Sequence, residues 1–214
     1  MSLSDFSGSA SLPPVDLCDD AAIRTRLGCS HVAVIGCGGL GSNVAMMLVR
    51  AGVRELTLVD YDVVDRSNLN RQMFFPDQIG QPKTDALAET LLRLEPGLSL
   101  HLHQVEATEH DVVALVSESQ VVVEAVDRAD VKAMVANILL VHRPGLPIVA
   151  ASGLAGAGSA NRIVTEELAS GFYMVGDHTS DVRNSLPLMS SRVMAAAAHE
   201  AHMAIRILLG YPEP

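Results

Sequence analysis

The stretch that decides the fold is His31–Asp60, HVAVIGCGGLGSNVAMMLVRAGVRELTLVD. The β-rich run of residues 31–35 predicts a buried strand that ends directly at glycines. An apolar pattern with helical spacing follows over residues 40–51 and stops at Gly52, and residues 54–59 predict a second strand that ends at the final aspartate. Together these elements predict a strand–helix–strand unit with two parallel strands.

The loop between the first strand and the helix, residues 36–41, has the spacing G-x-G-x-x-G. Gly36 allows a tight turn, Gly38 lets a phosphate approach the backbone without an intervening Cβ, and Gly41 lets the helix pack closely on the strand. Free N–H groups at the helix start favour an anion, and Asp60 suits ribose hydroxyls. The unit predicts a nucleotide site, although NAD, FAD and ATP all suit such a loop.

Strands and helices continue to alternate after this unit. Further strands are expected over residues 98–105, 120–126 and 147–151, further helices over residues 82–94, 110–117, 129–142 and 188–209, and short extra strands over residues 161–165 and 172–175. This order predicts an α/β fold: a doubly wound, Rossmann-like, mainly parallel sheet with helices on both faces and short extra strands near the C-terminus. We expect residues 28–214 to form a single domain and residues 1–27 an extension, partly disordered, with a helix as the alternative.

The composition narrows the class of protein. Of the 214 residues, 49% are hydrophobic but only 3% aromatic, which suits an aliphatic core around a parallel sheet. The net charge of −10 argues against a nucleic-acid or anionic-membrane partner, because both need a basic surface. No apolar run reaches the roughly 18 residues of a membrane span. The three cysteines form no C-x-x-C pair, so we expect a reducing, cytoplasmic compartment and no four-cysteine zinc site.

A polar run after the second predicted strand separates the nucleotide candidates. A dehydrogenase has no evident need for the Asn, Arg, Gln and Lys residues of this run. Triphosphate chemistry needs such residues, because fixed cations and amide donors stabilise the charge that develops on the α-phosphate and the leaving pyrophosphate. Arg71 offers a bidentate fork and Lys83, in the first turn of a predicted helix, a point charge. Taken singly, each is better explained as a surface residue, an ion pair for Arg71 and a solvated helix position for Lys83.

Four motifs together resemble those of the ThiF/MoeB family in the ubiquitin-activating enzyme superfamily. They are GCGGLGS (Gly36–Ser42), LVDYDVVDRSNLNRQ (Leu58–Gln72), GQPKTDAL (Gly80–Leu87) and EAVDRADVK (Glu124–Lys132), in the family's order. The resemblance implies a role for each matching residue. Adenosine and ribose of ATP would be bound by Gly36, Gly38, Gly39, Gly41 and Asp60, the phosphates by Asn68, Arg71, Gln72 and Lys83, and Mg²⁺ by Asp127. The catalytic set would be Arg71, Lys83 and Asp127, with capping of the helix over residues 129–142 as the alternative for Asp127.

The chain departs from the family pattern in two places. It lacks the paired C-x-x-C zinc ligands, so no zinc is expected. Residues 171–187 contain no cysteine that could take over the activated carrier, so sulfur transfer by this chain is not expected. Cys37, inside the glycine loop, is expected to pack rather than react. The N-terminal arginine of relatives has no clear counterpart, which leaves open whether Arg24, Arg26 or neither fills its role.

The leading hypothesis is an adenylyltransferase that uses ATP and Mg²⁺ to activate the terminal glycine carboxylate of a small ubiquitin-like sulfur carrier. The resemblance implies a ThiS-like partner ending in Gly-Gly, a homodimer and thiamine biosynthesis, with molybdopterin biosynthesis or another sulfur-carrier pathway as the alternative. An NAD-dependent oxidoreductase and a non-catalytic nucleotide- or carrier-binding protein are the alternatives. A tRNA-modifying dehydratase of the same superfamily agrees poorly with the acidic charge. Among the histidines, His101 and His103 alternate along a predicted strand and are expected at the surface.

Overall fold

The computed structural model describes residues 12–180 and 186–214. Within this part of the chain, seven strands form one sheet in the order β3-β2-β1-β4-β5-β7-β6. The strands are β1 (His31–Ile35), β2 (Glu55–Val59), β3 (Ser99–His103), β4 (Val121–Glu124), β5 (Ile148–Ala151), β6 (Val164–Ala169) and β7 (Phe172–Gly176). All neighbouring strands pair in parallel except β6, which is antiparallel to β7. The predicted mainly parallel α/β sheet is therefore confirmed.

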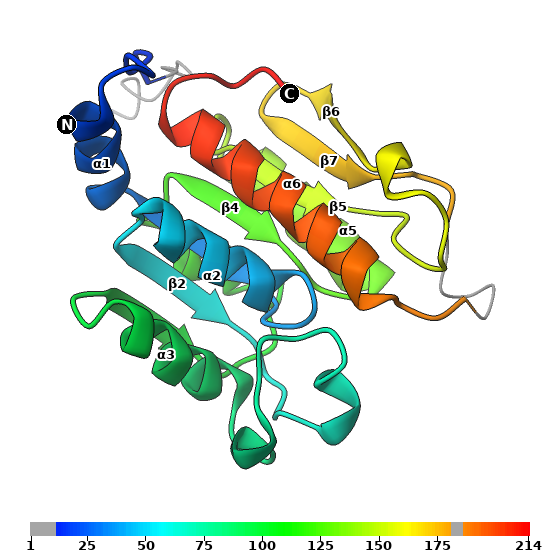
Figure 1. Ribbon diagram of the computed structural model, residues 1–214. Coiled ribbons are helices and arrows are strands. Elements are labelled where there is room, and N and C mark those ends of the chain that lie inside the picture. The colour runs from blue at the N-terminus through cyan, green and yellow to red at the C-terminus, as the bar shows by residue number, and fades with distance from the viewer. Residues whose placement is uncertain (1–11, 181–185) are drawn as a thin grey trace.

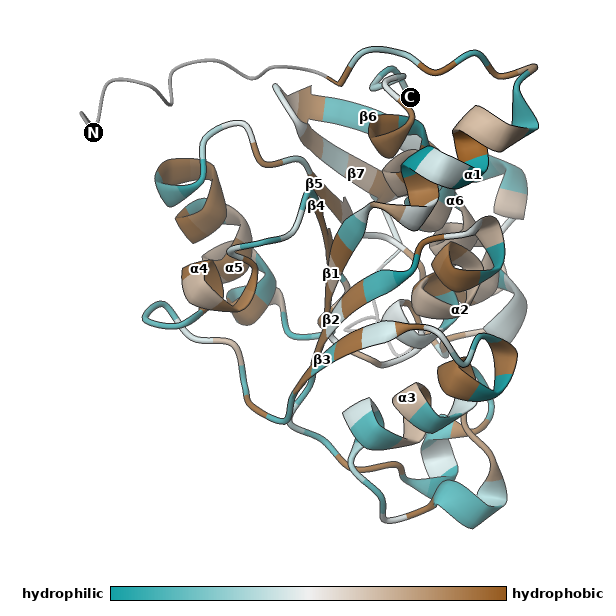
Figure 2. Ribbon diagram, turned by 90° about the vertical axis from the view of Figure 1, so that its left-hand side faces the viewer, coloured by the Kyte–Doolittle hydropathy of each residue, from teal (hydrophilic) through white to brown (hydrophobic). Residues whose placement is uncertain are grey.

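Helices cover both faces of this sheet, as predicted. They are α1 (Asp20–Gly28), α2 (Gly41–Ala51), α3 (Lys83–Leu94), α4 (Val112–Leu115), α5 (Ala129–His142) and α6 (Ser190–Leu208). Helices α4 and α5 lie on one face, and the other four lie on the opposite face (Figure 2). The long helix α6 packs beside α2 across the sheet (Figure 1). Every residue of β1 and β4 is buried, which explains why these strands are apolar along their length.

The N-terminal extension packs on the same core. The backbone N–H of Val15 donates to the Leu209 carbonyl at 2.9 Å, and the Tyr211 hydroxyl donates to the Val15 carbonyl at 2.8 Å. Val15 and Leu27 are buried, and α1 contacts α6. A helix therefore does form in the extension, while residues 1–11, for which disorder was expected, lie outside the described residues. The division at residue 28 stays a prediction.

Two elements differ from the sequence-based expectations. The helix expected over residues 110–117 has only one turn. The backbone N–H groups of Ser117 and Ser119 each donate to the carbonyl three residues earlier, which replaces the α-helical pattern with tighter turns. The strand expected over residues 161–165 starts later, because Ala160–Arg162 form a 3₁₀ turn that the Ser159 hydroxyl caps. Strand β6 follows that turn as an exposed edge strand with a β-bulge. None of the described helices is long and apolar enough to cross a membrane.

Candidate nucleotide-binding site

A cleft of about 610 Å³ opens at the carboxyl ends of the central strands. It is lined by the end of β1 with the glycine loop, the end of β2, the segment joining β4 to α5, and the segment after β5. Strands β2 and β4 flank β1 on opposite sides. Because successive crossovers turn in opposite directions from β1, a crevice forms at its carboxyl end, where ligands of doubly wound folds bind.

The glycines of residues 36–41 serve different purposes. A Cβ on Gly36, whose φ is +95°, would lie 2.7 Å from the Ala125 carbonyl oxygen, and one on Gly41 would lie 1.8 Å from the Gly36 oxygen. Both glycines are therefore required by the backbone itself. A Cβ on Gly38 would meet only the Gln72 side-chain nitrogen, at 3.7 Å, so packing does not explain this glycine. Gly38 lines the cleft, where a Cβ would occupy ligand space.

Helix α2 begins at the end of this loop with no side-chain cap on its first turn. The N–H groups of its first turn are therefore available to an anion, apart from that of Ser42, which donates to the Gly38 carbonyl at 3.1 Å. The Ser42 hydroxyl donates to the Gly38 carbonyl, and the Asn43 amide donates to the carbonyls of Gly39 and Arg71. These bonds hold the loop in shape and join it to the segment that carries Arg71.

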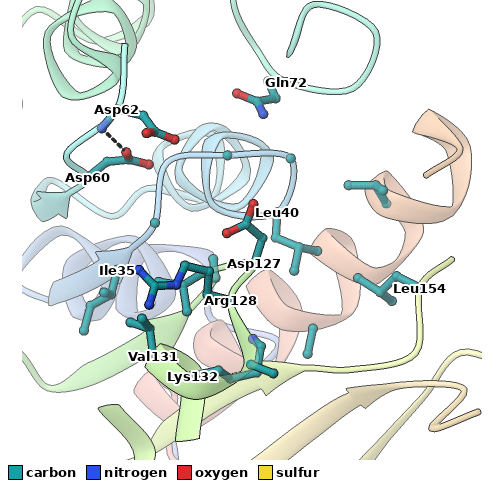
Figure 3. A pocket seen from close by; sticks show the side chains of 18 of the residues that line it. Ile35, Leu40, Asp60, Asp62, Gln72, Asp127, Arg128, Val131, Lys132 and Leu154 are labelled. Atoms are coloured by element: carbon teal, nitrogen blue, oxygen red, sulfur yellow. Dashed lines mark hydrogen bonds between the residues drawn. The ribbon is translucent and has the colours of Figure 1, made fainter. Parts of the chain in front are cut away.

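Asp60 directly follows β2 and holds the glycine loop through a hydrogen bond to its backbone. Its carboxylate accepts the backbone N–H of Cys37 at 2.6 Å. It also accepts the backbone N–H of Asp62 at 2.8 Å (Figure 3). Burial raises the pKa of Asp60, while the Lys83 ammonium and these two N–H groups oppose the rise. Both carboxylate oxygens retain lone pairs for further donors, and the ribose role stays a prediction. Cys37 is fully buried, and burial raises the pKa of its thiol, in keeping with its expected packing role.

Lys83 is the first residue of α3, as expected, and it is almost completely buried. Its ammonium donates to the Asp62 carboxylate at 2.7 Å, and its backbone N–H donates to the Asp62 carbonyl at 3.0 Å. Asp62 was not singled out from the sequence. Its position two residues after Asp60, in the same acidic run, was the signal that could have identified it.

Arg71 and Gln72 reach the cleft from the polar segment after β2. One guanidinium nitrogen of Arg71 donates to the Ser67 carbonyl and the Asn70 side chain. Gln72 is only 8% exposed, and its side-chain oxygen has no hydrogen-bond partner among the described residues. A buried amide oxygen without a partner, on the wall of a cleft, is suited to a hydrogen-bond donor of a ligand, such as a hydroxyl group or a bound water.

Asn68 lies outside the cleft lining and closes a 3₁₀ turn, Arg66–Asn68. Its side chain accepts the Asp65 backbone N–H at 3.0 Å, and its carbonyl accepts the N–H groups of Arg71 and Gln72. In this arrangement Asn68 orients the two residues after it. Direct phosphate contact by Asn68, expected from the resemblance, stays a prediction.

Asp127 follows β4 and lines the cleft, and its side chain accepts no hydrogen bond from any described residue. The alternative role as a helix cap is wrong, because the N-cap of α5 is Arg128 and no side chain caps that helix. Arg128 instead pairs with Glu106 and Asp130, each at 2.7 Å. Figure 3 shows Asp127, Arg128 and Lys132 at the start of α5.

A buried acidic cluster adjoins the cleft at Lys132. The Lys132 ammonium contacts the Glu124 carboxylate at 2.5 Å, and Glu124 is fully buried. Glu200, on α6, is also fully buried, and neither of its carboxyl oxygens has a partner among the described residues. Burial raises the pKa of Glu200 well above its usual value, against the influence of Lys132. Glu124 could have been suspected as the one charge in the apolar run QVVVEAV.

A buried ion pair lies behind the cleft and contacts Leu154 and Ser180, which line it. The Arg192 guanidinium contacts the Asp177 carboxylate at 2.8 Å and donates to the carbonyls of Gly158 and Ser159 at 2.6 and 3.0 Å. Burial favours the neutral acid, but hydrogen bonds from Ser180, Thr179 and Arg192 together lower the pKa of Asp177. Arg192 thereby fastens two loops to α6, and sequence spacing carries no signal of this contact.

Known proteins with similar sequences include activating enzymes for ubiquitin-like modifiers. Ubiquitin-like modifier-activating enzyme 5 of Oryza sativa subsp. japonica is 44% identical over 77 residues, which are 36% of this chain and 18% of that protein. The enzyme of the same name from Arabidopsis thaliana is 46% identical over 77 residues, with the same coverage. The matched region thus spans less than a fifth of these relatives.

Solved structures share the fold. Escherichia coli tRNA N6-threonylcarbamoyladenosine dehydratase, TcdA, in complex with ATP superposes with a TM-score of 0.80 at 21% identity, covering 87% of this chain and 88% of that one. E. coli MccB with ATP gives a TM-score of 0.71 at 24% identity, covering 90% and 59%. These likenesses establish the architecture. The ThiF family model matches residues 12–214, and the chain belongs to the ThiF family, as its four motifs indicated.

Proposed function

We propose that this chain is an adenylyltransferase that uses ATP to activate the C-terminal glycine carboxylate of a small ubiquitin-like carrier protein. The observation that supports this most strongly is the shared cleft of the glycine loop, Arg71, Gln72 and Lys83. Two cations beside a helix N-terminus, with the Gln72 amide nitrogen as a further donor next to Gly38, suit a polyphosphate better than a nicotinamide cofactor. The ATP complexes of TcdA and MccB, which share this fold, support the choice of nucleotide.

In the proposed complex, each part of the cleft meets one part of ATP. The ribose hydroxyls donate to Asp60, and the adenine lies among apolar side chains such as Val59, Val105 and Val131. The triphosphate crosses Gly38 toward Arg71, Gln72 and Lys83. The direct neighbour of Lys83 is Asp62, so a phosphate would compete with that carboxylate for the ammonium.

The reaction needs no side-chain nucleophile, because the carrier carboxylate is already anionic. One carboxylate oxygen forms a bond to the α-phosphorus, the bond from that phosphorus to the β-phosphate oxygen breaks, and pyrophosphate leaves. Arg71 and Lys83 stabilise the charge on the α- and β-phosphate oxygens, and the cleft holds the two reactants in line. The buried Cys37 thiol takes no part.

Asp127 is the residue we assign to Mg²⁺. Its carboxylate lines the cleft without a hydrogen bond from any described residue, and Mg²⁺ commonly takes one or two carboxylates together with phosphate oxygens. When bound, the ion would neutralise part of the charge on the phosphates. Asp127 would hold it at the carboxyl end of β4, next to the glycine loop.

The finer assignments are a ThiS-like carrier ending in Gly-Gly, a role in thiamine biosynthesis, and a homodimer. They are supported by the family of the chain, and sulfur would come from a separate donor because residues 171–187 contain no cysteine. TcdA, by its name, acts on tRNA, but it is only 21% identical and the net charge here is −10. A protein carrier therefore remains the better proposal.

Exchange of labelled pyrophosphate into ATP in the presence of Gly-Gly-ended carriers tests the proposed function. We expect carrier-dependent exchange that falls about 10²–10³-fold in Arg71→Ala and in Lys83→Ala. The matched control is Arg66→Ala, since Arg66 is exposed in the same segment but outside the cleft lining. Two results together would favour the oxidoreductase instead. They are the absence of exchange with every Gly-Gly-ended carrier tested, and calorimetry that shows tight binding of NAD but no binding of ATP.

A further inference from the structure

A second cluster of chemically active side chains lies on the sheet, away from the nucleotide cleft. His31, Glu55 and His101 place one donor atom each within 4.8 Å of one another. The geometry points to a binding site for one divalent transition-metal ion of the Zn²⁺ type at these three residues. This inference does not depend on the proposed adenylyltransferase activity.

Strand register explains why the three residues meet. His31 on β1 pairs with Glu55 on β2, and Thr57 on β2 pairs with His101 on β3. Alternate residues of a strand share a face, so Glu55 and Thr57 point the same way and place all four side chains on one face. Each ligand thus comes from a different strand. His31 is the first residue of β1, and Ile35, the last residue of that strand, lines the nucleotide cleft. The cluster and the cleft therefore lie at opposite ends of β1.

The donor atoms converge on one carboxylate oxygen. Nε2 of His101 lies 2.9 Å from Oε1 of Glu55, and Nδ1 of His31 lies 3.9 Å from the same oxygen. The two imidazole rings face each other with centroids 5.2 Å apart. Small movements of these side chains would bring the three donors to the roughly 2.0–2.2 Å bond lengths of zinc.

The orientation of His31 has the support typical of a metal ligand. Its Nε2 lies 2.8 Å from the Thr57 hydroxyl, and both residues are buried. With Nε2–H donating to Thr57, the lone pair of Nδ1 faces Glu55. Metal-ligating histidines almost always use the second ring nitrogen in such a hydrogen bond, which fixes the tautomer and the ring.

The ligand set selects the class of metal. Two imidazoles with one carboxylate suit Zn²⁺ and related ions, whereas Mg²⁺ and Ca²⁺ prefer oxygen ligands. The side chains of Glu55 and His101 are 39% and 41% exposed, so an ion can enter from solvent and water can complete a tetrahedral shell. A bound ion would join β1 and β2 to the edge strand β3. His101 was expected merely at the surface, and its cross-strand partners were not foreseen.

The test is calorimetric titration of chelator-treated, full-length protein with Zn²⁺, followed by thermal unfolding with and without the ion. We expect one ion per chain, a higher Tm with Zn²⁺, and loss of both effects in His101→Ala and Glu55→Gln. These two positions are half exposed, so the variants should fold. His103→Ala is the matched control, since His103 lies on the same strand and is not in the cluster.

Thr57→Val tests the supporting hydrogen bond. It should weaken Zn²⁺ binding about tenfold while the stoichiometry stays at one. Absence of binding by the wild-type chain would overturn the proposal, as would undiminished binding in both His101→Ala and Glu55→Gln. Equal loss in His103→Ala would overturn it too, because that result would assign the ion to another place.

Discussion

Lys83 and Asp62 form an ion pair at the edge of the nucleotide cleft, with 2.7 Å between ammonium and carboxylate, and the lysine side chain is only 7% exposed. The same ammonium favours the ionised form of the buried Asp60. One lysine therefore compensates two carboxylates, one half exposed and one buried. This shared dependence makes Lys83 a structural residue even when no nucleotide is bound.

Lys83→Met should destabilise the fold by about 2 kcal/mol, because Asp60 loses its nearby cation while Asp62 can still turn to water. Asp60→Asn is itself destabilising, because one amide oxygen cannot replace both carboxylate oxygens that accept the N–H groups of Cys37 and Asp62, but it should cost less in the Lys83→Met variant than in the wild type. Urea unfolding of the two single variants and the double variant gives the coupling energy. Simple additivity of the two changes would contradict the account.

Gly38→Ala should mainly weaken ATP binding, whereas Gly36→Ala should mainly lower the stability of the fold. In Gly38→Ala the new Cβ meets no atom closer than 3.7 Å, so Tm should change little while ATP binding weakens about tenfold or more. In Gly36→Ala the Cβ meets backbone at 2.7 Å with φ at +95°, so the fold itself should weaken. Thermal unfolding and ATP calorimetry separate the two cases. Unchanged ATP affinity in Gly38→Ala would remove the loop from the binding site.

Glu200→Gln should change the pH dependence of stability. Because the pKa of Glu200 is raised in the folded chain, this chain keeps a proton that the unfolded chain releases above its ordinary pKa of 4.5. The free energy of unfolding therefore falls with rising pH from that value upward, by at most about 1.4 kcal/mol per pH unit, until the raised pKa is reached. Glu200→Gln lacks this term, while Glu124 and Lys132 remain in both proteins. Urea unfolding should show that the free energy of unfolding of the variant rises relative to that of the wild type between pH 5 and pH 7. The same difference between the two proteins at both pH values would refute the prediction.

Arg192→Met should cost about 3 kcal/mol of stability, because it leaves the buried Asp177 without its cation and the Gly158 and Ser159 carbonyls without a donor. Arg192→Met combined with Asp177→Asn should be more stable than Arg192→Met alone. Arg162→Met, at an exposed position in the nearby turn, is the control and should leave the free energy of unfolding nearly unchanged. Denaturant unfolding measures all three.

Local signals were sufficient for most of the fold. Gly52, with φ at +116°, ends α2 where a left-handed residue was needed, and the apolar runs of β1 and β4 identified buried strands. Strand β6 was placed too early, since its exposed residues lack the alternation that marks a half-buried strand. It pairs with β7 in a tight hairpin, and Gly171 in the turn, with φ at +74°, was the local signal that could have placed it.

The site was predictable only where its residues follow directly from motifs. Arg71, Gln72, Lys83 and Asp127 all line the cleft, as their motif positions implied, and Asn68 does not. Three residues in and around the cleft were missed. Asp62 and Arg192 form ion pairs with residues distant in sequence, and Glu200 is buried on α6. These relationships become visible only when the helices are placed on the sheet.

The central claim is that a carrier carboxylate attacks the α-phosphorus of ATP in this cleft. The most direct measurement uses a Gly-Gly-ended carrier whose terminal carboxylate is labelled with oxygen-18, with hydroxylamine added to capture the acyl group. The account predicts AMP that carries one labelled oxygen, together with unlabelled pyrophosphate, and loss of both products in Lys83→Ala. AMP without label, or formation of ADP and phosphate in place of AMP, would contradict it.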